Sequence, residues 1–266
     1  MSAPLPPLLL VGLGKMGGAM LAGWREQGVA RVVAIDPALP AAPGPEVTVV
    51  AGAADVPADF RPEAVVLAIK PQQAAATLPA YAGRRGAVFL SIMAGRGIGG
   101  MRAALGDAAA IVRAMPNTPA AVRQGITVAC AGPGVTAAQR ALCDRLLAAI
   151  GTVAWVEDEA LLDPVTAVSG SGPAYVFLLA ELLEQAAVEQ GISSDLARLL
   201  ARRTVSGAGA LLAASPEESA ALRRAVTSPG GTTQAALEVL MASAAWPATL
   251  RRAVAAATRR SRELAG

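Results

Sequence analysis

The chain has 266 residues, of which 54% are hydrophobic and 16% are charged, and its formal net charge is +3. It contains no histidine, which excludes Ser-His-Asp and Cys-His nucleophiles and HExxH zinc sites, and its two cysteines argue against a structural zinc site. Any chemistry must therefore depend on hydroxyls, carboxylates, backbone amides, arginine or a cofactor.

Composition also limits the expected partners and location. Basic residues are dispersed and aromatic residues make up only 3%, so nucleic-acid binding has little support. No run is long and apolar enough for a membrane span, and the N-terminal residues lack the basic region of a signal peptide. Cys130 and Cys143 form no CxxC pair, so we expect reduced, buried thiols. These features predict a soluble cytoplasmic protein.

From residue 8 to about residue 156, strand-like and helix-like segments alternate along the chain. The expected strands are residues 8–12, 31–36, 47–50, 64–69, 87–92, 109–115 and 126–131. The expected helices of this part are residues 16–27, 97–105 and 136–150. Strands that alternate with helices are typical of an α/β fold with a doubly wound, mainly parallel sheet.

After residue 158 we find no convincing strand pattern. The expected helices are residues 175–190, 196–214, 233–243 and 247–264, with another that begins at Pro216 after a Ser215 cap. We therefore divide the chain into a dinucleotide-binding domain, residues 1–160, and an all-helical domain, residues 161–266. The helical domain is apolar enough that we expect it to bury a face against a second copy, with an intramolecular bundle as the alternative.

The stretch "VGLGKMG" follows the first strand and opens a helix. Gly12, Gly14 and Gly17 satisfy the GxGxxG pattern, which allows a tight turn, close approach of a pyrophosphate, and close helix–strand packing. The expected cofactor-binding residues of this loop are Gly12, Leu13, Gly14, Lys15, Met16 and Gly17. Asp36 ends the second strand and could bind the adenosine ribose hydroxyls, which would favour NAD over NADP. A surface loop could also carry this aspartate without any such role.

A second polar loop lies between two apolar helical runs of the C-terminal half. The stretch "SPGGTT", residues 228–233, supplies two glycines, a proline and three hydroxyls. This is more hydrogen-bonding capacity than a turn between helices requires.

Four further stretches occur in order along the chain: "AIKPQ" (68–72), "SIMAG" (91–95), "RAMPNTPA" (113–120) and "AVSGSGPAYVF" (167–177). With the "SPGGTT" loop they resemble the pyrroline-5-carboxylate reductase family over nearly the whole chain. The resemblance implies a Rossmann domain and a helical domain that interlocks with a second subunit as a homodimer, with larger rings such as a decamer of dimers as an option. It also implies hydride transfer from NADPH or NADH to the C=N carbon of 1-pyrroline-5-carboxylate, which gives L-proline in the last step of proline biosynthesis.

The same resemblance assigns residues to the two ligands. The residues implied on the cofactor side are Ala68, Lys70, Pro71, Ala94, Gly95 and Asn117. Those implied to hold the substrate carboxylate are Ser228, Gly230, Gly231, Thr232 and Thr233. A cyclic imine is basic enough to arrive largely protonated, so its reduction needs no histidine. We expect Thr233 to be the catalytic hydroxyl near the imine nitrogen, although its simpler role is a helix cap.

Other interpretations remain to be separated from this one. A β-hydroxyacid dehydrogenase has a similar layout but depends on a lysine in its helical part, and no lysine follows Lys70 here. A reductase of another cyclic imine and a non-catalytic dinucleotide-binding regulatory protein are the two remaining alternatives.

Some residues depart from the family pattern or have two interpretations. Relatives often carry Arg, Ser or Asn in place of Asp36, and an acid in place of Gln185, so the choice between NADH and NADPH stays open. Arg113 could support the sheet edge or touch a ligand. Glu181 and Glu184 could simply be surface charges of a helix.

Overall fold

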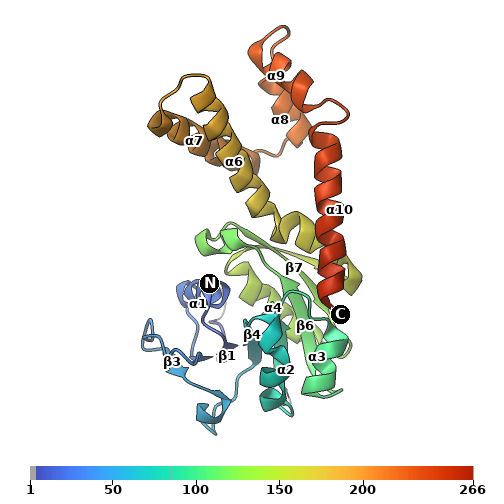
Figure 1. The fold of residues 1–266 in the computed structure, drawn as a ribbon. Coiled ribbons are helices and arrows are strands. Elements are labelled where there is room, and N and C mark those ends of the chain that lie inside the picture. The colour runs from blue at the N-terminus through green and yellow to red at the C-terminus, as the bar shows by residue number, and fades with distance from the viewer. Residues whose placement is uncertain (1–3, 85, 266) are drawn as a thin grey trace. The chain divides into compact units, whose positions relative to one another are not determined.

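The computed structural model describes residues 4–84 and 86–265 (Figure 1). They form two compact units. One contains the described residues up to Gly170 together with those from Ala257 onward, and the other contains Ser171–Ala256. The first unit holds the β-sheet, and the second is made of helices and loops.

Eight strands build the sheet of the first unit. They are β1 (Leu8–Val11), β2 (Val32–Ile35), β3 (Val47–Val50), β4 (Ala64–Leu67), β5 (Val88–Ser91), β6 (Ala110–Met115), β7 (Gly125–Ala131) and β8 (Gly151–Val156). Their order is β3-β2-β1-β4-β5-β6-β7-β8, and every neighbouring pair is parallel except β6 and β7. The winding changes direction between β1 and β4, as expected for a doubly wound sheet.

The central strands are apolar because both of their faces are buried. Every residue of β1 ("LLLV") and of β4 ("AVVL") is buried. Alternate side chains enter different cores: Leu8 and Leu10 pack on one face of the sheet, whereas Leu9 and Val11 pack on the other. The strand period therefore determines which helices each residue meets.

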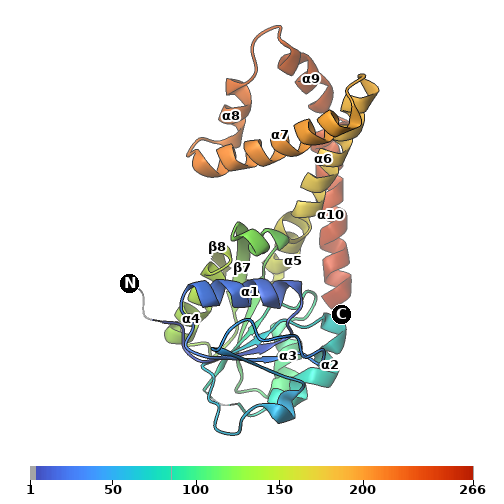
Figure 2. The same cartoon turned by 90° about the vertical axis from the view of Figure 1, so that its left-hand side faces the viewer.

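Four helices cover these two faces (Figure 2). The helices α1 (Lys15–Glu26) and α4 (Ala137–Ala148) share one core, and α2 (Ala74–Thr77) and α3 (Ile98–Leu105) share the other. The indole Nε1 of Trp24 in α1 donates a hydrogen bond of 2.9 Å to the carbonyl of Leu146 in α4. The short helix α5 (Leu162–Val165) and a π-helical turn at Thr166–Gly170 follow the sheet.

The sequence pattern does not predict β8. This strand is an edge strand, and its short apolar run, residues 153–156, is only partly buried, with Thr152 and Ala154 exposed. It begins at Gly151, whose φ is +142°, and a Cβ there would lie 2.0 Å from the carbonyl oxygen of Gly125 on β7. Only glycine allows the two strands to start so close together.

The second unit contains α6 (Gly172–Glu189), α7 (Ser194–Ala214), α8 (Ser219–Ala225), α9 (Thr232–Leu240) and the first part of α10 (Trp246–Ala265). The helices α6 and α7 pack against each other. The helix expected to begin at Pro216 begins instead at Ser219. The reason is local: the hydroxyl of Ser215 accepts a hydrogen bond from the amide of Glu217 at 3.1 Å, which forms a turn before the helix.

Most large apolar side chains of the second unit are exposed in the single chain. Among its described residues only Ala197 and Ala201 are buried apolar residues, whereas Phe177 is 66% exposed and Val239 is 71% exposed. The stretch Glu159–Glu189 is long and apolar enough, by length and composition alone, to cross a membrane, which the sequence analysis did not expect. The π-helical turn lies within that stretch. Large exposed apolar surfaces of this kind mark sites where a protein contacts a partner or a membrane.

Both cysteines lie in the first unit as buried free thiols, as expected. Burial raises the pKa of the Cys143 thiol to about 12. Burial also raises the pKa of the Cys130 thiol, with a further contribution from the nearby carboxylates of Glu157 and Glu159. Both thiols are therefore protonated near neutral pH and suit a reducing environment.

Candidate functional site

A pocket of about 450 Å³ lies at the carboxyl ends of β1 to β4. Parallel strands end at the same edge of a sheet, so the loops that follow them meet there. Of the expected cofactor residues, those that line this pocket are Gly12, Gly14, Asp36, Ala68 and Lys70. Those outside its lining are Leu13, Lys15, Met16, Gly17, Pro71, Ala94, Gly95 and Asn117.

The three glycines of the first loop have three different surroundings. Gly12 has a φ of +101°, and a Cβ there would lie 2.6 Å from the carbonyl oxygen of Ala68. A Cβ on Gly17 would lie 2.1 Å from the carbonyl oxygen of Gly12. A Cβ on Gly14 would meet no atom within 4 Å. The first and third glycines are therefore required by the fold itself, whereas the second leaves open space at the N-terminus of α1.

The carboxylate of Asp36 organises the same loop. Its Oδ2 accepts a hydrogen bond from the amide of Leu13 at 3.1 Å, and its Oδ1 accepts one from the amide of Ala38 at 2.9 Å. Asp36 therefore joins the end of β2 to the glycine loop and also lines the pocket. Each carboxylate oxygen can accept a further hydrogen bond.

The loops after β4 and β5 are joined by an arginine that the sequence analysis did not single out. The guanidinium Nε of Arg96 donates a hydrogen bond of 3.1 Å to the carbonyl of Pro71. Gly95, which directly precedes Arg96, has a φ of +65°. A Cβ there would lie 3.0 Å from the carbonyl oxygen of Leu264. The expected residues around Lys70 and Gly95 thus belong to two loops in direct contact.

The side chain of Asn117 makes internal hydrogen bonds at both ends. Its Oδ1 accepts from the amide of Ile126 at 3.0 Å, and its Nδ2 donates to the carbonyl of Ser169 at 3.2 Å. Asn117 is buried, and Ser169 lies in the π-helical turn. This amide therefore connects the "MPNTPA" and "SGSGP" stretches, a function that sequence spacing did not reveal.

Arg113 forms a buried ion pair with a residue that the sequence analysis also missed. Its Nη1 lies 2.9 Å from Oε1 of Glu159, and the side chain of Arg113 is only 7% exposed. Of the two interpretations given to Arg113, the observed contact supports the structural one. The signal for Glu159 was absent from the sequence because its partners are distant along the chain.

The "SPGGTT" loop opens α9 within the second unit. The amide of Gly231 donates to the carbonyl of Ser228 at 3.0 Å, and Gly230 has a φ of +69°. Pro229 and this positive φ are typical of a type II turn. The amide of Gly230 also donates to the side-chain oxygen of Gln234 at 2.8 Å. The hydroxyls of Ser228, Thr232 and Thr233 make no hydrogen bond to any residue that the structure describes.

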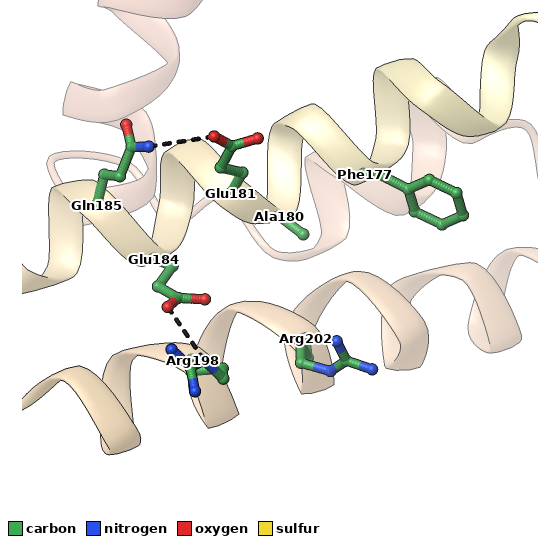
Figure 3. Close-up of a pocket in the computed structure, with 7 residues that line it drawn as sticks. All are labelled: Phe177, Ala180, Glu181, Glu184, Gln185, Arg198 and Arg202. Atoms are coloured by element: carbon green, nitrogen blue, oxygen red, sulfur yellow. Dashed lines mark hydrogen bonds and ion pairs between the residues drawn. The ribbon is translucent and has the colours of Figure 1, made fainter.

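A further recess of about 350 Å³ lies between α6 and α7. Figure 3 shows residues that line it: Glu184 of α6 pairs with Arg198 of α7 at 3.2 Å, and Gln185 donates to Glu181 along α6 at 3.4 Å. Gln185 lies one helical turn after Glu181 and donates a hydrogen bond to it. An acid at position 185 would instead repel the carboxylate of Glu181. These contacts match the surface-charge interpretation of Glu181 and Glu184.

Comparison with known proteins shows the family. The model for pyrroline-5-carboxylate reductase dimerisation matches residues 159–264, and the model for NADP oxidoreductase, coenzyme F420-dependent, matches residues 8–95. The chain is 40% identical to the pyrroline-5-carboxylate reductase of Pseudomonas aeruginosa, over 98% of this chain and 97% of that protein.

The chain belongs to the pyrroline-5-carboxylate reductase family.

Solved structures of family members have the same fold. The enzyme from Coxiella burnetii aligns with a TM-score of 0.87 and 31% identity, over 97% of each chain. The enzyme from Plasmodium falciparum, determined with NADP bound, aligns with a TM-score of 0.84 and 26% identity, over 100% of each chain. The family resemblance and the expected architecture, a Rossmann-type sheet followed by a helical dimerisation domain, are therefore confirmed.

The two internal hydrogen bonds of Asn117 predict a stability effect. We expect Asn117→Ala to lower the free energy of unfolding by about 1–3 kcal/mol, because it leaves buried backbone groups of Ile126 and Ser169 without partners. Urea denaturation measures this difference. Gln124→Ala, an exposed change on the same loop, should have an effect within about 0.5 kcal/mol. Equal effects of the two substitutions would contradict the assignment.

Proposed function

We propose that the chain reduces the C=N bond of 1-pyrroline-5-carboxylate with NADPH or NADH and so forms L-proline, the last step of proline biosynthesis. The observation that carries this proposal is the 40% identity to a reductase of that name over 98% of the chain. In this assignment residues 1–160 bind the dinucleotide, and residues 161–266 bind the substrate and a second subunit.

The pocket at the carboxyl ends of β1 to β4 fits a dinucleotide. The open space at Gly14 and the amides at the start of α1 suit a pyrophosphate. We assign Asp36 to the adenosine ribose hydroxyls, and Ala68 and Lys70 line the same pocket. The loop residues Leu13, Lys15, Met16 and Gly17 complete this end of the proposed cofactor site.

The nicotinamide half of the cofactor is assigned to the loops after β4, β5 and β6. The residues proposed to border it are Pro71, Ala94, Gly95 and Asn117. The contact of Arg96 with Pro71 supports a common position for the first two loops. Because both polar ends of its side chain are used internally, Asn117 would act there through the shape of the loop it holds.

The substrate carboxylate is assigned to the start of α9. The type II turn at Ser228–Gly231 leaves the first amides of α9 without carbonyl partners in the helix. Those amides and the hydroxyls of Ser228 and Thr232 can bind a carboxylate, and Gly230 and Gly231 leave room for it. Four residues of this loop are thereby given one common role, to orient the anionic end of the substrate.

The bound cofactor supplies a hydride to the C=N carbon. The ring nitrogen must carry one proton, which the imine brings when it arrives protonated. Thr233 lies in the first turn of α9, beside the residues assigned to the carboxylate, and its hydroxyl is free to donate a hydrogen bond to that nitrogen. It acts as the proton donor only for substrate that arrives neutral. No histidine is needed for either route.

The exposed apolar helices support a homodimer through the helical domain. The dimerisation model covers residues 159–264, which include α6, α7 and α9 and their exposed Phe177 and Val239. A second copy, and not a membrane, is proposed as the cover of the apolar stretch Glu159–Glu189. Further assembly of dimers, up to a decamer of dimers, would use other surfaces. We also propose a soluble cytoplasmic location, since free thiols suit a reducing compartment, and no nucleic-acid partner is proposed.

The proposed activity is tested by the loss of absorbance of the reduced nicotinamide with 1-pyrroline-5-carboxylate as substrate. Oxidation of NADPH or NADH is expected. A folded protein that binds the cofactor but oxidises neither would contradict the proposal. If the protein reduced a cyclic imine of different ring size but not 1-pyrroline-5-carboxylate, it would be a different imine reductase.

The role of Thr233 predicts a change in turnover. We expect Thr233→Ala to lower kcat by at least about tenfold, since a hydrogen bond at the reacting nitrogen is lost. Thr233→Ser, which keeps the hydroxyl, should retain most activity. Cofactor affinity, measured by fluorescence titration, should stay unchanged in both. Wild-type turnover in Thr233→Ala would remove the catalytic assignment.

The position of Asp36 predicts a preference for NADH. We expect Asp36→Asn to raise the ratio of kcat/KM for NADPH to that for NADH by about tenfold, because the carboxylate repels the 2′-phosphate. The isosteric amide keeps one oxygen for the loop amides. Asp107→Asn, an exposed change outside the pocket, serves as the control. An unchanged ratio in Asp36→Asn would place the ribose elsewhere.

Substitution of Gly17 should lower stability, whereas substitution of Gly14 should lower cofactor affinity. Gly17→Ala places a methyl group against the carbonyl of Gly12 and should lower the free energy of unfolding by about 1–3 kcal/mol. Gly14→Ala meets no protein atom, so its melting temperature should match the wild type while its affinity for the cofactor falls by about tenfold. Thermal denaturation and fluorescence titration separate the two. Normal cofactor affinity in Gly14→Ala would contradict the proposed pyrophosphate position.

A further inference from the structure

One carboxylate oxygen joins three separate segments of the first unit. Oε1 of Glu159 accepts a hydrogen bond from the amide of Ile98 at 2.8 Å and another from Nη1 of Arg113 at 2.9 Å. Ile98 is the first residue of α3, Arg113 lies within β6, and Glu159 begins the turn that follows β8. No role was assigned to Glu159 above beyond its ion pair.

The helix α3 has no cap of its own. Its N-cap residue is Gly97, which has no side chain that could accept a hydrogen bond from the first turn. Glu159 supplies that acceptor from 61 residues away in the sequence. A carboxylate is also favoured there by the partial positive charge of the helix N-terminus. Glu159 therefore provides the side-chain cap of α3, whose first residue, Ile98, also packs in the core.

The position of α3 determines where the preceding loop ends. Residues 92–97 leave β5 and enter α3, and they include Ala94 and Gly95 of the proposed nicotinamide border. The loop is held at its start, where the hydroxyl of Ser91 accepts from the amide of Met93 at 3.3 Å, and at Arg96, which donates to Pro71. Glu159 is the anchor at its far end.

The same carboxylate also holds the strand that leads to the second border loop. Arg113 lies on β6 shortly before Asn117, and its guanidinium is buried with Glu159 as its ion-pair partner. Without Glu159 this cation would be buried and unpaired. One side chain thus links the loops after β5 and β6.

We propose that Glu159 is a positioning residue for hydride transfer, which sets the loop of residues 92–97 and the end of β6 at the nicotinamide through its bonds to Ile98 and Arg113. This inference rests on the proposed function, because it takes residues 94, 95 and 117 as the border of the nicotinamide. Glu159 itself touches neither ligand in this assignment.

The test compares four variants of the full-length protein. Glu159→Ala removes both bonds, and Glu159→Gln keeps an oxygen that can accept from Ile98. Glu157→Gln is the matched control, because Glu157 lies on the same segment, is 88% exposed and pairs only at the surface with Arg140. The double variant Arg113→Met with Glu159→Met removes the buried cation together with its partner, so that folding does not depend on the ion pair.

Four readouts are needed: the dissociation constant for NADH from fluorescence titration, hydrogen exchange of the peptide covering residues 92–98, kcat against KM, and the melting temperature. We expect Glu159→Ala to weaken NADH binding and to lower kcat by about tenfold each, with faster exchange in that peptide and a lower melting temperature. Glu159→Gln should recover most of the affinity, and Glu157→Gln should match the wild type. The double variant should recover the melting temperature but not the affinity.

Two results would overturn the inference. Wild-type NADH affinity and exchange in a folded Glu159→Ala variant would show that the loop does not depend on this residue. Recovery of affinity as well as melting temperature in the double variant would show a purely structural ion pair. Failure of the proposed function is separate: the wild-type protein would then not oxidise NADPH or NADH with 1-pyrroline-5-carboxylate, whereas the exchange of residues 92–98 would still respond to Glu159.

Discussion

The in-register position of β1 between β2 and β4 is the constraint on which the rest of the first unit depends. Val11 lies opposite Ile35 on one side and Leu67 on the other, so three strands end at the same level. The chain must leave β1 between two neighbouring backbones, and it does so through Gly12, which lies against the carbonyl of Ala68. Because the helix then packs directly on this turn, its N-terminal amides face the pocket at the strand ends. The proposed dinucleotide site is a consequence of strand order.

A second feature is that several polar residues near this edge hold backbone in place. Asp36 binds the amides of Leu13 and Ala38, and Asn117 binds Ile126 and Ser169. Three of these four bonds lie in partly buried surroundings, where a backbone group without a partner lowers stability, so the side chains help to hold the loops in place. Residues that resemble ligand contacts in the sequence can therefore act on the ligand indirectly, through the shape of the loop that they stabilise.

The stability of the helical unit is limited because the unit has almost no hydrophobic core in the single chain. Its long helices expose Phe177, Val239 and many leucines, and only two small alanines are buried among its described apolar residues. Burial of apolar surface is the main stabilising contribution in folding, so this unit gains most of it from another copy in the proposed dimer. In that dimer the stability of the unit would depend on protein concentration, and the loop proposed to bind the substrate, at the start of α9, belongs to this unit.

Local features of the sequence determined much of this protein. The glycine spacing and the Pro-Gly turn before α9 could be read from the sequence because few residues other than glycine adopt their backbone conformations. The contacts that Gly12 and Asp36 make with Ala68 and Leu13 are long-range. The alternation of apolar strands with helices likewise predicted the doubly wound sheet, because burial on both faces leaves an apolar run in the sequence.

Tertiary structure decided the features that depend on long-range pairing. The edge strand β8 exposes alternate residues, so only its pairing with β7 identifies it. Glu159 lies 61 residues from Ile98 and 46 residues from Arg113, and no local pattern indicates that they meet. Strand order brings such residues together, and the antiparallel step between β6 and β7 is part of that order. Hydrogen bonds of this kind form only after the sheet has placed distant segments side by side, which is the physical reason that the sequence alone left them undetermined.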